Sequence, residues 1–265
     1  MQELITELTR LYVLEPQLCF DGAGREHAVP LSAARLEQHL LGVRTVALAL
    51  RSPAGLGRAI VLDFSAGGAA RGEQQWRALA ATANVLRDDF ELPSPAVNIS
   101  GHGFQLWLSL QDALPAGRIA EFAALLRDYC LPERLKADFD NGKLETVAEL
   151  PPGRQANGKW SAFIHPGMGA SFADDPALEM APPLSAQLGF LEGLQSITPE
   201  GFESALAALR RAQGVAAAPA PEPARQDQAA PAQGSVLLRE ASLEDIVREL
   251  HARNIEPSLR HILKS

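Results

Sequence analysis

The sequence predicts an α+β fold, because segments with the pattern of strands alternate with segments of helical periodicity along the chain. Proline, glycine and helix-capping residues separate these segments. The 265 residues suffice for a full hydrophobic core, in one large domain or two smaller ones. A hydrophobic content of 46% and a charged content of 21% are typical of a soluble globular protein.

The first quarter of the chain is predicted to form two helices and two strands. Residues 1–16 carry apolar side chains at helical spacing, and Pro16 ends the helix. Ser32 is a favourable N-cap for a second helix, which Gly42 ends. A strand over residues 43–50, a turn over 52–57 and a second strand over 58–64 follow.

The alternation continues to residue 213. Helical periodicity over 73–90 ends before Pro93 and Pro95. Strands over 97–99 and 106–110 then enclose a glycine-rich turn. The remaining predicted elements are a helix from Pro115 to residue 129, a strand over 160–164, and helices over 185–194 and 198–213.

Composition divides the chain into three parts. Residues 1–213 form the α/β domain, and residues 214–234 are so rich in Ala, Pro and Gln that they predict a flexible linker. Residues 235–265 predict a short helical tail with one apolar face, formed by Leu243, Ile246, Val247 and Leu250. We expect residues 242–264 to bind a protein partner or a second copy of the chain; the alternative is that they dock on the chain's own domain.

Charge and cysteine content narrow the class of protein. The net charge of −8 means that nucleic acid would have to bind in a local basic groove. Cys19 and Cys130 form no CxxC unit, which indicates neither a zinc site nor a disulfide framework. The chain lacks a run of about eighteen apolar residues, and its acidic N-terminus is unlike a secretory signal. We therefore expect a cytoplasmic protein that does not enter a membrane.

The turn Ser100-Gly101-His102-Gly103 has two interpretations. A plain β-hairpin uses the same residue types. Two glycines also allow the backbone to approach a ligand, and successive N–H groups can hold an anion. His102 could meet such an anion or be an ordinary polar turn residue.

Carboxylates supply the candidate metal ligands. Asp63 ends an apolar strand, where a carboxylate can bind metal, cap a helix or stabilise a turn. A nucleotidyl-transfer site would need a second carboxylate two residues later, and Ser65 stands there. Asp138 and Asp140 could share a site with Asp63, but the Asp-Asn-Gly that begins at Asp140 also favours a turn.

A loop carries two cations and an aromatic residue, Arg154, Lys159 and Trp160, which suit phosphate and base contacts. The alternative is a solvated loop and hairpin without a ligand. The chain contains no Walker loop, HExxH, GxGxxG or serine-triad spacing.

Taken in order, residues 36–42, 60–64, 100–107 and 150–160 resemble the archaeo-eukaryotic primase superfamily, particularly the primase-polymerases that include TOTE conflict-system primases. The resemblance covers about residues 32–180. It implies an RRM-like antiparallel sheet beside an N-terminal α/β unit, with the site between them. In that family, an Asp-x-Asp or Asp-x-Glu strand and a later acidic residue hold divalent metal. The histidine of a Ser-Gly-x-Gly-x-His turn contacts the incoming triphosphate.

This sequence departs from the family at the chemical positions. Asp63 matches the first acidic residue, but Ser65 replaces the second and Gln105 replaces the histidine. Loss of one metal carboxylate should cost several kcal/mol of transition-state stabilisation. The resemblance therefore implies a nucleotide- or nucleic-acid-binding protein with a degenerate site. It would be an accessory or scaffold subunit in replication, repair or defence.

Two alternatives stay open. One is an active DNA primase-polymerase that uses Mg²⁺ or Mn²⁺ with Asp63 and either Asp138 or Asp140. The other is a protein-interaction module without nucleotide affinity.

Overall fold

Two antiparallel sheets organise the protein in the computed structural model, which describes residues 1–21, 28–65, 71–130 and 143–214. The chain divides into the units Met1–Ala218 and Pro219–Ser265. The predicted linker and tail lie outside the described residues, as do Asp138 and Asp140. The predicted α+β class is confirmed.

The larger sheet has the order β7-β4-β6-β5-β10-β9. Its strands are β4 (Leu56–Asp63), β5 (Ala96–Ile99), β6 (Phe104–Pro115), β7 (Lys143–Leu144), β9 (Gly153–Arg154) and β10 (Trp160–Ile164). Helix α3 (Gly72–Asp88) follows β4, and helix α4 (Ala116–Cys130) follows β6. The core order β7-β4-β6-β5 with these two helices is the βαββαβ arrangement of an RRM-like sheet, as expected.

The smaller sheet has the order β2-β1-β3-β8. Its strands are β1 (Leu18–Asp21), β2 (Val29–Pro30), β3 (Val46–Ala49) and β8 (Val147–Glu149). The sequence pattern did not predict β1 and β2. Only one residue of β1, Cys19, is buried, so the strand has no alternation of apolar and polar residues.

The other helices are α1 (Gln2–Tyr12), α2 (Ala33–Leu40), the 3₁₀ helix η2 (Pro166–Phe172), α6 (Leu184–Leu191) and α7 (Pro199–Ala212). The predicted cap at Ser32 is confirmed, since Ser32 accepts a hydrogen bond from the N–H of Arg35; Thr198 caps α7 in the same way by accepting one from the N–H of Gly201. The first helix ends at Tyr12 rather than Pro16. Among the described residues, no helix combines the length and apolar character needed to cross a bilayer.

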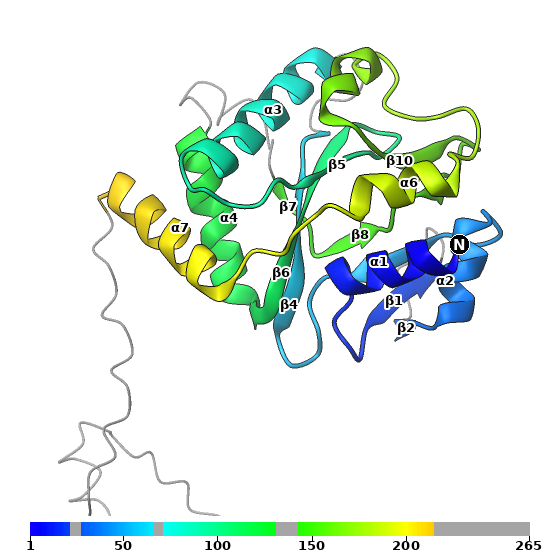
Figure 1. The fold of residues 1–265 in the computed structure, drawn as a ribbon, viewed down its shortest axis with the longest axis horizontal. Helices are drawn as coiled ribbons and strands as arrows, with labels where there is room; N and C mark the ends of the chain where they lie inside the picture. Colours follow the sequence, from blue (N-terminus) through cyan, green and yellow to red (C-terminus); the bar gives the residue numbers. More distant parts are fainter. Residues whose placement is uncertain (22–27, 66–70, 131–142, 215–265) are drawn as a thin grey trace, which may run out of the picture. The chain divides into compact units, whose positions relative to one another are not determined.

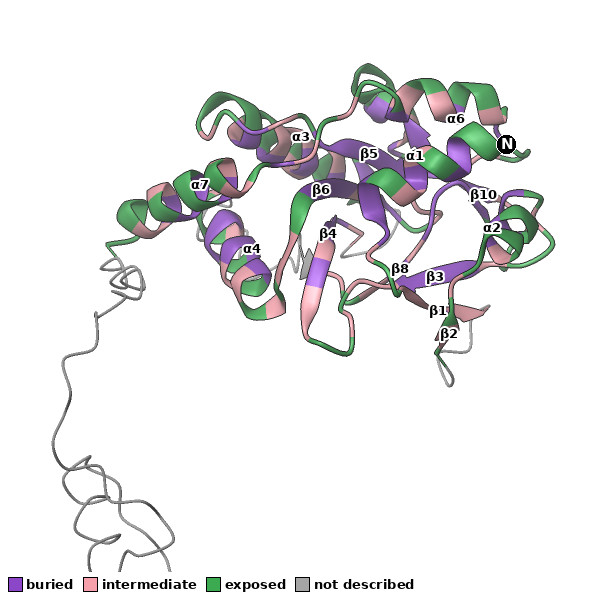
Figure 2. Ribbon diagram, turned by 60° about the horizontal axis from the view of Figure 1, so that its bottom comes forward, coloured by how far each residue is buried: buried purple, intermediate pink, exposed green. Residues whose placement is uncertain are grey.

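Both faces of the larger sheet are covered, because alternate residues of each strand enter different cores (Figures 1 and 2). In β4, Ile60 and Leu62 face the core with α3, α4 and α7. Ala59 and Val61 face a second core, shared with α1, α6 and the smaller sheet. Asp63 is two residues after Val61 in the same strand, so it points to the same face of the larger sheet, toward the smaller sheet.

Candidate functional site

Three polar side chains form a row across the centre of the larger sheet. Asp63 of β4 pairs directly with Gln105 of β6, which pairs with Asn98 of β5. Direct cross-strand neighbours point to the same face of a sheet. The two residues at which the chain departs from the primase pattern, Ser65 and Gln105, therefore lie beside the aspartate that they would have to assist.

The carboxylate of Asp63 accepts hydrogen bonds from both of these residues. The N–H of Ser65 donates to Oδ1 over 2.9 Å, and the Ser65 hydroxyl donates to the same oxygen. Nε2 of Gln105 donates to Oδ2 over 2.9 Å. The side-chain oxygen of Gln105 accepts from Nε1 of Trp107 over 3.2 Å and from Nδ2 of Asn98 over 2.9 Å. Because an indole nitrogen can only donate, the Gln105 amide must direct its nitrogen toward Asp63.

This donor set does not by itself fit a divalent cation. Mg²⁺ and Mn²⁺ need several oxygen ligands, and Asp63 already accepts three hydrogen bonds. The described residues contain no group of three His, Cys, Asp or Glu side chains able to hold a metal ion. Asp138 and Asp140 lie outside the described residues.

The glycine turn lies directly against the segment that follows Asp63. A Cβ atom at Gly103 would come within 2.6 Å of the Cα of Ser65, so only glycine fits without a shift of the backbone. The N–H of Phe64 donates to the carbonyl of Phe104 over 2.9 Å, which fixes the two segments beside each other. Asp63, Ser65, Gln105 and the turn thus converge in one place.

Two backbone amides of the turn donate hydrogen bonds within the described structure, and two do not. The N–H of Ser100 donates to the carbonyl of Gly103, and the N–H of Gly101, at φ +83°, donates to the carbonyl of Pro176. These two amides are therefore occupied. The amides of His102 and Gly103 donate no hydrogen bond to the described residues. The exposed His102 side chain lies next to them.

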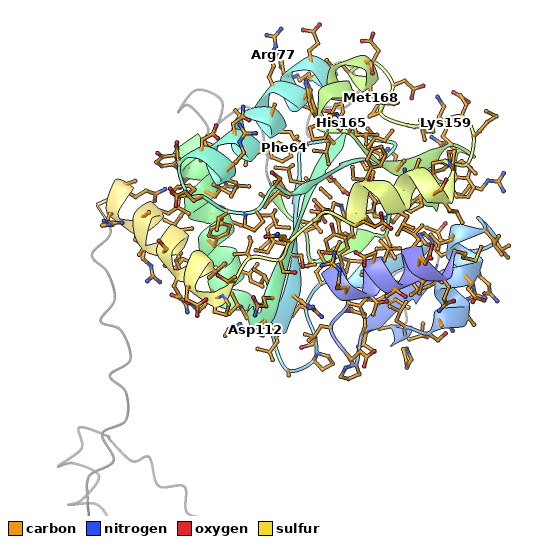
Figure 3. All side chains as sticks on the ribbon, in the orientation of Figure 1. Phe64, Arg77, Asp112, Lys159, His165 and Met168 are labelled. Carbon is orange, nitrogen blue, oxygen red and sulfur yellow. The ribbon has the colours of Figure 1, made fainter. Side chains whose placement is uncertain are left out.

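The structure places Lys159 away from Asp63 and buries Trp160. Lys159 lies at the periphery, well to one side of Phe64, the neighbour of Asp63 (Figure 3). It forms ion pairs with Asp175 at 2.6 Å and Glu179 at 2.8 Å, and these carboxylates raise its pKa. Trp160 is only 8% exposed, so its faces are covered by protein in this conformation. Lys159 is thus paired with two carboxylates, and the ring of Trp160 is not exposed for base stacking.

Arg154 remains accessible and lines an open groove of about 430 Å³. The groove lies between the segment Gly42–Thr45 and the β9–β10 hairpin, and Arg44 and Glu149 also line it. Gln155 lines the groove and also lies 3.2 Å from the position of a Cβ at Gly101. The groove is therefore adjacent to the glycine turn.

Sequence reasoning did not identify Asn98, Trp107 or Arg44 as members of these sites. Asn98 is only 1% exposed within an apolar strand, and a buried amide in such a strand is a signal that could have been used. Trp107 lies two residues after Gln105 on the same face of β6, so alternation along the strand would have placed it there.

No protein-family model matches the chain, and no curated protein matches it by sequence. Among solved structures, it is similar to the AEP domain of the primase-polymerase (PrimPol) of cyanophage S-2L. The TM-score is 0.39 and the identity is 16%, over 72% of this chain and 97% of that domain. At this level, the similarity says nothing about the chemistry of the present chain.

Proposed function

We propose that the chain is a primase-like nucleotide-binding protein whose catalytic site is degenerate. It would act as an accessory or scaffold subunit rather than as a polymerase. A protein partner or a second copy would bind through residues 242–264, which lie outside the described residues.

The observation that carries this proposal is the pairing of Ser65 and Gln105 with the same carboxylate. In a metal-dependent site, both positions would carry groups that work on metal or triphosphate. Here both side chains donate hydrogen bonds to Asp63 and so occupy acceptor positions that a cation would need.

The glycine turn supports retained nucleotide binding. The amide of His102, which donates to no described residue, and the exposed His102 ring supply donors at the tip of the turn, whereas Gly103 is buried. Successive backbone N–H groups in a turn suit phosphate oxygens. A phosphate bound in this way needs no bridging metal, so binding should be independent of Mg²⁺ and Mn²⁺.

Binding of a fluorescent nucleoside triphosphate to the full chain, with Mg²⁺ and then with excess EDTA, tests the proposal. We expect similar affinity in both conditions, and a loss of about ten-fold in His102→Ala, since a hydrogen bond to a charged group contributes about 1.5–3 kcal/mol. Asp112→Ala is a matched control, because Asp112 is an exposed residue of β6 outside the site (Figure 3).

Primer extension on the same preparations separates the alternatives. We expect no synthesis with Mg²⁺ or Mn²⁺. Robust synthesis that Asp63→Ala abolishes and Asp112→Ala preserves would refute degeneracy and favour an active primase-polymerase. Absence of nucleotide binding at low salt, with partner binding intact, would instead favour a protein-interaction module.

A further inference from the structure

Three exposed apolar side chains belong to segments that contact Trp160. Among the described residues, Leu41 is 61% exposed, Val43 is 74% exposed and Met180 is 79% exposed. These are high values for large aliphatic side chains, which fold preferentially into the core. Scattered single residues need no explanation, but a cluster marks an interaction site.

Two contacts of Trp160 link the segments that carry these three residues. The Trp160 ring lies under Gly42, where a Cβ would be 2.6 Å from the ring atom Cη2. The backbone of Trp160 pairs with Leu178 through N–H to O distances of 2.8 and 2.9 Å. Leu41 and Val43 flank Gly42, which contacts the Trp160 ring. Met180 is two residues after Leu178, which pairs with the Trp160 backbone.

The adjacent groove adds positive charge to this apolar surface. Arg154 forms no ion pair with the described residues, and Arg44 shares the single carboxylate of Asp21 with Arg35. The carboxylate of Glu149 is the acidic group that lines the groove. Among the residues that line the groove, two arginines therefore outnumber one carboxylate, although the whole chain carries a net charge of −8; Glu179, next to Met180, is paired with Lys159.

We propose that this surface, the rim surface of Leu41, Val43, Arg44, Arg154 and Met180, docks an acidic amphipathic segment of a partner protein. Arginine and methionine are enriched at protein interfaces. The apolar residues would receive one face of the segment, and the arginines would bind its carboxylates in charge-assisted hydrogen bonds.

Nucleic acid fits the rim surface less well. Single strands bind where bases can stack on exposed aromatic faces, and the ring of Trp160 is covered. The rim surface has aliphatic side chains where such a platform would be needed. This inference stands independently of nucleotide binding at the turn.

The test uses the full chain and a fluorescein-labelled synthetic helix-forming peptide with Leu along one face and Glu elsewhere. Fluorescence anisotropy should show saturable binding. Arg154→Ala should weaken it by about ten-fold and Val43→Ser by about five-fold. Exposed positions off the rim, Arg77→Ala on α3 and Met168→Ser on η2 (Figure 3), serve as matched controls and should leave binding unchanged.

Nucleotide affinity measured on Val43→Ser keeps the two proposals apart, because Val43 belongs neither to the turn nor to the residues expected to contact phosphate. Thermal unfolding of Val43→Ser and Arg154→Ala should match the parent protein, since both residues are exposed. Absence of peptide binding, equal losses in the off-rim controls, or Arg154-dependent binding of oligo(dT) without binding of the acidic peptide would each overturn the proposal.

Discussion

Replacement of His39 by alanine should destabilise the protein strongly, because this buried ring joins three segments. Nε2 contacts the carbonyl of Leu150 at 2.6 Å, and Nδ1 accepts the N–H of Val46 over 3.0 Å. Since Nδ1 accepts, Nε2 must carry the proton and donate to Leu150. A Cβ at Gly153 would lie 2.6 Å from the His39 ring, so the ring is tightly packed against the backbone at this position.

The magnitude follows from what His39→Ala leaves behind. Two buried backbone groups lose their partners, at about 1–3 kcal/mol each. The ring also leaves a cavity, and we expect a total loss of about 3–5 kcal/mol. Urea denaturation followed by circular dichroism measures this as a lower midpoint with an unchanged slope.

Two further variants sharpen the His39 experiment. His39→Asn keeps an acceptor near Nδ1 for the N–H of Val46 and should recover part of the loss. His102→Ala removes an exposed histidine and should change stability by less than about 0.5 kcal/mol. A loss of under about 1 kcal/mol in His39→Ala would refute the reasoning, because the backbone groups would then have found other partners.

Three other predictions concern the same framework. Burial lowers the pKa of His39 below its ordinary value of 6.5, so its contribution is complete above that pH and is lost as pH falls toward the lowered pKa. Unfolding free energies from about pH 7.5 to about pH 5 should thus fall more steeply in the parent than in His39→Ala; parallel slopes would contradict this. Gly103→Ala should weaken nucleotide binding by displacing Ser65, and unchanged affinity by fluorescence titration would show that the contact relaxes freely. Ser65→Asp should create Mn²⁺ affinity measurable by calorimetry, because it removes a donor from Asp63 and adds a second carboxylate; no heat of binding would place the metal position elsewhere.

Local patterns predicted much of the larger sheet. Ile60 and Leu62 alternate with Val61 and Asp63, and Ser32 supplies a strong N-cap, so residues in one segment suffice to define these elements. The glycine turn was likewise readable, although its contact with Ser65 depends on how β4 and β6 pair.

Tertiary contacts decided the remainder. Lys159 and Trp160 are adjacent to Arg154 in a way that suits nucleic acid, but a loop residue, Asp175, pairs with Lys159, and Gly42 covers Trp160. Both contacts come from distant parts of the chain, so the linear sequence gave no indication of them. The role of Gln105 depended in the same way on the partners that its amide finds.

Ser65 and Gln105 are best understood as one electrostatic change rather than two. A carboxylate offers about four lone-pair positions, and three of those on Asp63 receive donors, namely the backbone N–H of Ser65, the Ser65 hydroxyl and the amide nitrogen of Gln105. A cation approaching Asp63 would therefore meet the positive ends of these donors. Restoring either position alone leaves the other donor in place, so Ser65→Asp together with Gln105→His should increase metal affinity more than the sum of the two single changes. Additive effects would mean that the two donors act on Asp63 independently.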